Sequence, residues 1–361
     1  MKIIQLIQKP QRRGAEIFAA QLSEQLKLTG NEVLLISIFE GESDLPFYGK
    51  WIRLNRPIGY RFFDFKGWKQ FSRIVKDFNP DIIQANAADT LKFSIFSKRL
   101  FKWKNPLIYR NANQMGDFIR NGFHKSFNQW LLNQVAGIVS VSKASAENLH
   151  NTFCYPLTKS IVIPIGIDLN EIDLKQKEKT LINLPENFLL QIGGLVPEKD
   201  PLGMLAIFSR ISATHQDLHL VFLGSGILRE KLVEKVEELD IESKVIMIPA
   251  LENIFPILNK ATALVLPSKI EGLPGVILEA MYCKVPVIAY DVGGIGEVVN
   301  KYRGWLVYSG DSKCFENELN HLIHTTDSER CALLSTSSQF IEEHYSISKI
   351  STQFEAYFNQ L

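Results

Sequence analysis

The residues best suited to chemistry lie in one run, 267–281, which reads Pro-Ser-Lys-Ile-Glu-Gly-Leu-Pro-Gly-Val-Ile-Leu-Glu-Ala-Met. Pro274 suits the first position of a helix, so the N–H groups of Gly275 and Val276 would be free to bind negative oxygens. Glu279 would then lie about 7.5 Å along the helix at 1.5 Å per residue, roughly the reach from a diphosphate to a nucleoside ribose. Glu271 lies just before the helix, where it can meet a sugar beyond the phosphates. Either glutamate alone fits an ordinary surface position, but the joint pattern favours a nucleotide-sugar site.

A second run supplies a cation. Gly193 and Gly194 follow the expected strand Phe188–Ile192, and Lys199 stands just ahead of the next helix. A lysine held at the carboxyl end of a strand can neutralise a diphosphate as it leaves. The alternative is a solvated surface lysine.

Two further loops are weaker candidates. Arg13 and Gly14 follow the first strand and open a helix, where free N–H groups suit a phosphate, although a plain strand-to-helix turn looks the same. Residues 290–297 carry three glycines after another strand, and tight packing explains them nearly as well.

Apolar β-rich runs alternate with helical patterns, which predicts parallel sheets with helices on both faces. The expected strands are Lys2–Ile7, Glu32–Ser37, Trp51–Leu54, Asp81–Gln84, Leu107–Arg110, Gly137–Val141, Ser160–Ile163, Phe188–Ile192, Leu218–Leu223, Lys244–Ile248, Ala263–Leu266, Pro286–Ala289 and Trp305–Val307. The expected helices are Ala15–Leu28, Lys66–Phe78, Asp89–Phe101, Arg120–Gln134, Lys143–His150, Leu202–Ala213, Ile227–Leu239, Pro274–Cys283 and Asp311–His324.

The polar stretch 168–185 separates two such series and reads as a linker between two doubly wound domains. Ligands of these folds bind beyond the carboxyl ends of the strands. We therefore expect an N-terminal domain over residues 1–168, a second over 169–345, and a final segment over 346–361.

Composition narrows the class of protein. Residues 1–170 carry 23 Lys and Arg against 13 Asp and Glu, and the remainder carries 17 against 26. This asymmetry points to an N-terminal domain that faces an anionic partner, and no nucleic-acid motif is present. The first residues lack a signal peptide's apolar region and no apolar stretch reaches membrane-spanning length, so we expect a cytoplasmic protein.

Metal and disulfide chemistry are not indicated. The four cysteines form no CxxC pair, His321 and His324 have no third ligand nearby, and no Asp-x-Asp pair lies in a strand-end loop. We expect no metal and no cofactor, the nucleotide sugar being a substrate.

These motifs resemble the retaining glycosyltransferases of the GT-B fold, family 4, whose two Rossmann-like domains face a central cleft. The resemblance is carried by Glu271 and Glu279 in a Pro-Ser-x-x-Glu-Gly-x-Pro frame, by Glu198-Lys199, and by the loops at 13–16, 141–144, 163–168 and 293–297. It implies that Glu279 holds the donor ribose, Lys199 the diphosphate and Glu271 the transferred sugar, with Glu271 and Lys199 as the catalytic pair. The pocket lining that it implies is Arg13, Gly14, Gly193, Gly194, Gly272, Leu273, Pro274, Gly275 and Val276.

The resemblance also implies retention of anomeric configuration, a UDP-sugar donor, and a last helix within 347–361 that returns to the N-terminal domain. Two departures stand out. Position 194 is Gly194 where members commonly carry arginine, and Arg110, Asn111 and Asn113 occupy an acceptor-side segment that often offers a histidine.

The acceptor is expected to be a glycan or a lipid-linked sugar in the synthesis of capsule, O-antigen or another cell-surface polysaccharide. Residues 90–104 mix basic and aromatic side chains at helical spacing. They suit either a peripheral contact with an anionic membrane on its inner face or a core-facing helix with a solvated basic side. A nucleotide-sugar epimerase and a catalytically silent partner subunit are the alternative functions.

Overall fold

The computed structural model describes residues 1–361, and the chain folds into two compact units. Unit 1 comprises residues 1–167 and 347–361, and unit 2 comprises residues 168–346. The boundaries expected from the sequence, after residues 168 and 345, lie one residue from these.

Unit 1 is built on a parallel seven-stranded sheet in the order β3-β2-β1-β4-β5-β6-β7. In the centre of the sheet, Ile4 pairs with Leu34 on one side and with Ile83 on the other. The strands are β1 (Lys2–Ile7), β2 (Glu32–Phe39), β3 (Lys50–Arg56), β4 (Ile82–Ala85), β5 (Leu107–Asn111), β6 (Gly137–Ser140) and β7 (Ser160–Val162). The inner strands carry continuous apolar runs that are buried on both faces, as a parallel sheet requires, whereas the edge strand β3 is partly exposed.

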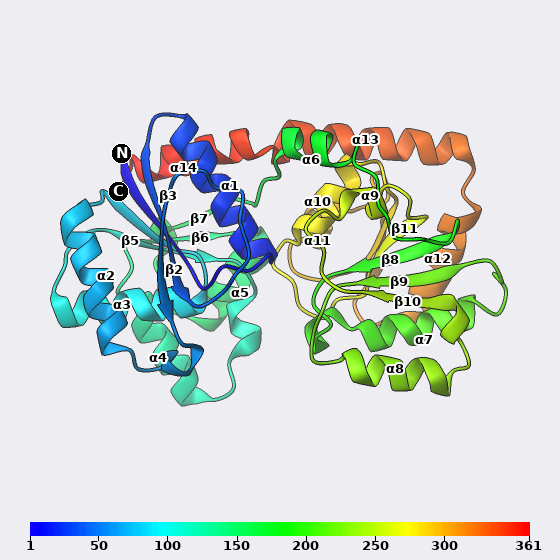
Figure 1. Ribbon diagram of the computed structural model, residues 1–361, viewed down its shortest axis with the longest axis horizontal. Helices are drawn as coiled ribbons and strands as arrows, with labels where there is room; N and C mark the ends of the chain where they lie inside the picture. Colours follow the sequence, from blue (N-terminus) through cyan, green and yellow to red (C-terminus); the bar gives the residue numbers. More distant parts are fainter. The chain divides into compact units, whose positions relative to one another are not determined.

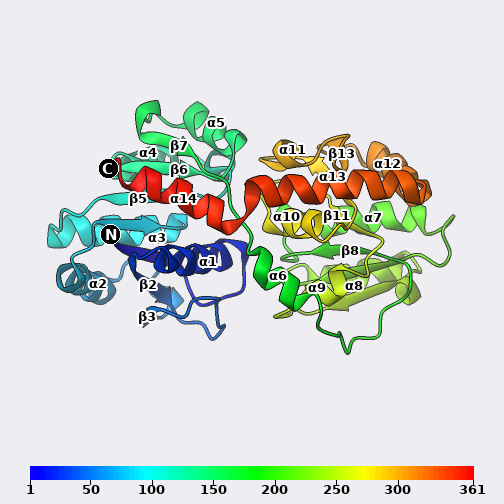
Figure 2. The same ribbon diagram turned by 90° about the horizontal axis from the view of Figure 1, so that it is seen from above.

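Helices cover both faces of this sheet (Figure 1). Figure 2 shows α1 (Gly14–Leu28) beside α14 (Ile347–Phe358) on one face, where the rings of Phe18 and Phe354 pack at a tilt of 46° with centroids 6.1 Å apart. The other face carries α2 (Phe65–Phe78), α3 (Ala88–Phe101) and α4 (Gly122–Leu132), which enclose a hydrophobic core. The remaining helix, α5 (Lys143–Thr152), connects β6 to β7.

Unit 2 repeats the plan with a parallel six-stranded sheet in the order β10-β9-β8-β11-β12-β13. Its strands are β8 (Phe188–Ile192), β9 (His219–Leu223), β10 (Val245–Ile248), β11 (Ala263–Leu266), β12 (Val287–Asp291) and β13 (Trp305–Tyr308). Its helices are α6 (Leu169–Lys175), α7 (Pro201–Ile211), α8 (Arg229–Glu238), α9 (Phe255–Leu258), α10 (Gly275–Tyr282), α11 (Ile295–Val298), α12 (Ser312–His324) and α13 (Asp327–Tyr345). One core cluster lies under α7, α8 and α12, and α10 packs against α13.

Every strand expected from the sequence is present, with ends that differ by at most two residues. The expected linker is wrong in its first half. Residues 169–175 form α6, which Asp168 caps by accepting a hydrogen bond from the Glu171 N–H at 3.0 Å. None of the helices combines the length and the apolar character needed to cross a bilayer.

Candidate functional site

The loop from β11 to α10 ends at Pro274, which takes an extended conformation (φ −77°, ψ 124°) and occupies the N-cap position of the helix. The helix therefore begins at Gly275, one residue later than the sequence suggests. The Ile277 N–H bonds to the Pro274 carbonyl at 3.2 Å, whereas the N–H groups of Gly275 and Val276 donate to no protein acceptor. These two amides, with the positive end of the helix dipole, can bind an anion.

Lys199 and Glu271 form an ion pair between the loops that follow β8 and β11. The Lys199 side chain is 28% exposed and that of Glu271 is 7% exposed, so the lysine is the one that a ligand can reach. Gln191 donates to the Lys199 carbonyl at 2.9 Å, and the Lys269 N–H donates to the Glu198 carbonyl at 2.8 Å. A diphosphate bound at Lys199 would compete with Glu271 for the ammonium group.

Glycines let a third loop close on the backbone of Glu271. Gly293 has a positive φ of 57°, and a Cβ there would lie 2.1 Å from the Glu271 carbonyl oxygen. The next N–H, of Gly294, donates to the Gly272 carbonyl at 2.5 Å. Any side chain at position 293 would push the loop away from Glu271.

The glycine pair at the end of β8 also has a packing reason. Gly193 adopts φ 146°, and its carbonyl oxygen would lie 1.8 Å from a Cβ on Gly224, at the end of the neighbouring strand β9. The glycines therefore allow two strand-end loops to touch. Gly194 keeps ordinary van der Waals distances to its neighbours, and Leu273 is buried in the β11–α10 loop.

Glu279 lies in α10 as a partly buried residue, and its carboxylate accepts no hydrogen bond from the protein. Burial, together with the Glu171 carboxylate of α6, raises the pKa of Glu279 to about 7, while Lys175 opposes the shift. Glu171 is itself paired with Lys175 at 2.5 Å. The carboxylate can thus accept hydrogen bonds from ligand hydroxyls, and ionises near neutral pH.

The other predicted residues belong to unit 1. Arg13 precedes the first turn of α1, and Gly14 opens the helix with no atom near the place a Cβ would take. Asn113 accepts from the Gln114 N–H at 2.9 Å. Asn111 is buried and donates to Ser140 at 3.3 Å and to the Ser145 carbonyl at 3.1 Å, so its amide is engaged in packing β5 against β6 and α5.

Arg110 is the largest fully buried side chain of the protein. Its guanidinium lies 4.3 Å from the centre of the Phe18 ring, and its Nε and Nη1 have no hydrogen-bond partner in the protein. Burial lowers the pKa of Arg110 to about 9, against the opposing effect of Glu16. Burial likewise raises the pKa of Glu16, which accepts from Gln11 at 2.9 Å.

Sequence reasoning missed several of these partners. Glu171 and Lys175 were assigned to a linker, although Asp168 followed by Glu171 is a helix-cap signal. Glu16 appears in the sequence only as part of a motif, and no local pattern indicates that it lies near the buried Arg110. No group of three or more His, Cys, Asp or Glu side chains in the protein has an arrangement that could hold a metal.

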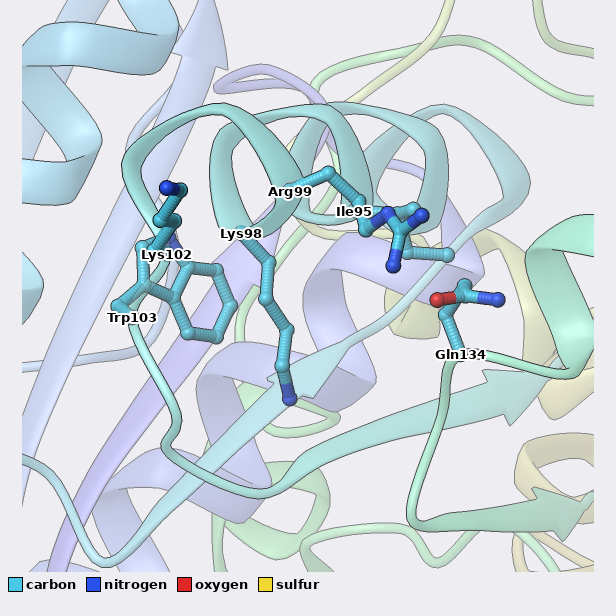
Figure 3. A pocket seen from close by; sticks show the side chains of 6 residues that line it. All are labelled: Ile95, Lys98, Arg99, Lys102, Trp103 and Gln134. Carbon is cyan, nitrogen blue, oxygen red and sulfur yellow. The ribbon is translucent and has the colours of Figure 1, made fainter.

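The aromatic residues of helix α3 face the core, as the second of the two predictions for residues 90–104 has it. Phe93 is buried, and Phe96, Phe101 and Trp103 pack against the same core, so its aromatic side faces inward. Its basic side lines a cavity of about 230 Å³ together with Ile95, Trp103 and Gln134 (Figure 3). There Lys98 donates to the Asn105 carbonyl at 2.9 Å and lies 5.2 Å from the Trp103 ring centre.

Family models of glycosyltransferases match both units of the chain. The family model described as Glycosyl transferases group 1 matches residues 173–338, and the one described as Glycosyltransferase Family 4 matches residues 12–171.

Two curated relatives are about equally similar. One, from Campylobacter jejuni, is named as a diphospho-undecaprenol 4-alpha-N-acetylgalactosaminyltransferase; it is 28% identical over 178 residues, 48% of this chain and 47% of its own. Another, from Escherichia coli, is named UDP-Gal:alpha-D-GlcNAc-diphosphoundecaprenol alpha-1,3-galactosyltransferase; it is 29% identical over 190 residues, 49% and 48% of the two chains. The chain thus matches about half the length of these relatives.

Among solved structures, the Anabaena protein HepE in complex with UDP-glucose aligns over 100% of both chains, with a TM-score of 0.82 and 18% identity. This likeness establishes the GT-B fold.

Proposed function

Because the chain belongs to the family 4 glycosyltransferases of the GT-B fold, we propose that it transfers a sugar from a nucleotide sugar to a glycan or lipid-linked acceptor. The observation that carries this proposal is the meeting of Lys199, Glu271 and the amino end of α10 at one edge of the unit 2 sheet. The lysine and the two free N–H groups suit the diphosphate of a nucleotide. The carboxylate of Glu279, the fifth residue of the helix, suits its ribose.

The transfer breaks the bond between the anomeric carbon and the diphosphate oxygen, and its electron pair leaves with the diphosphate. Lys199 and the N–H groups of Gly275 and Val276 stabilise that developing charge. The acceptor hydroxyl oxygen forms the new bond to the anomeric carbon, and its proton passes to the departing diphosphate. Glu279 binds the ribose, and Glu271 orients the transferred sugar.

Retention and metal independence are part of the proposal. In the site, positive charge comes from Lys199 and the helix dipole, so a divalent cation is not required to hold the diphosphate. Retention is proposed from family membership.

The donor and acceptor classes are proposed from the relatives. The Anabaena structure contains UDP-glucose, the name of the Escherichia coli relative includes UDP-Gal, and both curated relatives are named for diphospho-undecaprenol substrates. We therefore propose a UDP-sugar donor, an acceptor of cell-surface polysaccharide synthesis, and action at the cytoplasmic face of a membrane that the basic N-terminal unit contacts.

A donor screen tests the proposal. The full chain is incubated with UDP-, GDP-, ADP- and CMP-sugars, with and without lipid-diphosphate-linked acceptors, and released nucleotide is measured. We expect release of UDP from one UDP-sugar, stimulated by acceptor, with the sugar found on the acceptor. Isomerised nucleotide sugar without transfer would identify an epimerase, and binding without turnover would identify a silent subunit.

A further inference from the structure

The segment between β3 and α2, residues 58–65, exposes an unusual group of large apolar side chains. Ile58, Tyr60, Phe62 and Phe63 are 58%, 52%, 73% and 71% exposed, and Phe65 is 48% exposed. Single exposed apolar residues are ordinary, but five within eight positions mark an interaction surface. We call this segment the 58–65 loop.

The loop is held in one shape by Asp64. Both oxygens of Asp64 accept from Arg56, at 2.8 and 2.9 Å, and Asp64 also accepts from the Gly67 N–H as the cap of α2. A Cβ at position 67 would lie 2.2 Å from Asp64, which is why a glycine stands there. The short helix Ile58–Tyr60 follows Pro57 directly. Binding through these aromatic side chains therefore costs little ordering of the backbone.

The charges that lie against the aromatic side chains of the loop are positive, whereas the exposed Glu40, whose N–H donates to the Arg56 carbonyl at 3.1 Å, lies at the start of the loop. Its one acid, Asp64, is buried against Arg56, and the nearby Asp89 is 6% exposed and paired with Arg61 and Lys92. Arg61, Lys66 and Lys69 are exposed. Lys92 lies 4.7 Å and Arg61 5.9 Å from the centre of the Phe62 ring. The surface around Phe62 is thus aromatic and mainly cationic.

We propose that the 58–65 loop inserts into the headgroup region of an anionic lipid bilayer. Aromatic rings gain most in that region, and lysine and arginine are attracted to anionic headgroups. This inference rests on the membrane contact within the proposed function and gives it a location, but it does not depend on the chemistry.

The place of the loop in the fold connects it to the acceptor. The loop follows the carboxyl end of β3, and Arg110 and Asn111 stand at the carboxyl end of β5, four strand positions away in the same sheet. At about 4.8 Å per strand this separation is about 19 Å. Docking through the loop brings that edge to the headgroups, where the diphosphate of a lipid-linked acceptor lies.

The cavity of Figure 3 is the competing location. It lies at the carboxyl end of α3, and therefore at the opposite edge of the sheet, where Asn105 bonds to the Pro80 carbonyl just before β4. Its Lys98 is already engaged by Asn105 and Trp103. The 58–65 loop is the better candidate because its aromatic side chains are exposed.

The test is co-sedimentation of the full chain with vesicles of phosphatidylcholine alone or mixed equally with phosphatidylglycerol, at low and high salt. The variant is Phe62→Ser with Phe63→Ser. The matched control is Tyr302→Ser with Tyr308→Ser, two aromatic residues of unit 2 that are 65% and 81% exposed. Phe62→Ser alone is a second variant, since Phe63 also contacts Trp68.

We expect the parent and the control to bind anionic vesicles equally, and the double variant to bind at least about tenfold more weakly. Lys66→Gln with Lys69→Gln should weaken binding about fivefold per lysine, and high salt should remove this difference. Circular dichroism melts confirm that each variant is folded.

Three outcomes overturn the inference: a parent that ignores anionic vesicles at low salt, a double variant that binds like the parent, and a loss caused only by Lys98→Gln with Arg99→Gln and Lys102→Gln. Self-association that the double variant abolishes would make the loop an interface between copies instead. Nucleotide release with a soluble acceptor separates the two proposals, because the double variant should release nucleotide as the parent does.

Discussion

The two units hold their charged strand-end groups in different ways. In unit 2, Lys199 is paired with Glu271 and stays partly exposed, and the pKa of Glu279 lies at about 7. In unit 1, Arg110 is fully buried, with two nitrogens that bond to nothing in the protein and a phenylalanine ring against its guanidinium. The charges of unit 2 can change partner or protonation state when a ligand arrives. Those of unit 1 are fixed by packing, so we expect them to act on stability and position.

The largest effect should come from Lys199→Ala. If Lys199 stabilises the leaving diphosphate, turnover should fall by about a hundredfold to a thousandfold, with a smaller change in donor affinity. Steady-state kinetics with the donor found in the screen measures this. Lys269→Ala is the matched control, because Lys269 pairs with Asp200 at 3.0 Å in the same loops but is 62% exposed. Equal losses in both variants would remove the special role of Lys199.

Next in size is the stability effect of Arg110. Arg110→Met should lower the unfolding free energy of unit 1 by about 3 kcal/mol, because the buried Glu16 would lose the favourable charge of Arg110 and keep only that of Arg13. Adding Glu16→Gln should recover most of the loss, since both charges are then absent. Urea unfolding of the two variants tests this, and nucleoside diphosphate affinity should stay unchanged in both. A recovery that fails would show that the pair does not interact as described.

Glu279→Ala should weaken nucleoside diphosphate binding by about 1.5 to 3 kcal/mol, because a carboxylate that accepts from ribose hydroxyls makes charge-assisted hydrogen bonds. Isothermal titration calorimetry gives the value. Glu237→Ala, on the exposed side of α8, is the control. Unchanged affinity would take Glu279 out of the ribose site.

The same glutamate predicts an opposite pH dependence for stability and for binding. Its pKa is raised from 4.5 to about 7 by folding, so its contribution to stability is present below pH 4.5 and is lost as the pH rises to about 7. Ligand hydroxyls favour the carboxylate, so binding should strengthen about tenfold from pH 6 to pH 8. Glu279→Gln should flatten both curves. Comparing it with the parent removes the titration of the ligand's own phosphates, and parallel curves would contradict the assignment.

The smallest expected effect is that of chelation. Excess EDTA should change turnover less than about twofold, because Lys199 and helix amides supply the positive charge at the diphosphate. Turnover after EDTA and after restored magnesium is the measurement. A complete loss that magnesium reverses would mean that a cation bridges the diphosphate.

Much of the fold could be predicted because parallel strands leave continuous apolar runs. The longest helix, α13, was missed for a physical reason: its buried positions include Ser337 and Ser338 beside Leu334 and Ile341, so no apolar stripe marks it. Its start was readable, since Thr326 and Glu329 form a capping box.

The sequence predicted the motifs of the candidate site but not the contacts between them. The spacing of Glu271 and Glu279 around the start of a helix is enough to indicate a nucleotide-sugar site. The ion pair of Glu271 with Lys199 joins residues 72 positions apart, which no local pattern reveals. Burial was the other property that the sequence did not reveal: the spacing of residues 90–104 left open whether their aromatic side chains face a membrane or the core, and the 58–65 loop was not singled out.

Because the chain returns to unit 1 beside the point where it leaves, the two units can be separated into two polypeptides. The Ile347 N–H donates to the Ile167 carbonyl at 2.8 Å, and Gly166 leaves room for Ile347, whose Cα would lie 2.9 Å from a Cβ at position 166. Unit 2 is therefore an insertion whose two ends meet at one point of unit 1. Residues 168–346 can be excised as a separate polypeptide, and a short glycine turn can close the gap that they leave. Such a pair of fragments would allow nucleotide binding and lipid binding to be measured on different molecules.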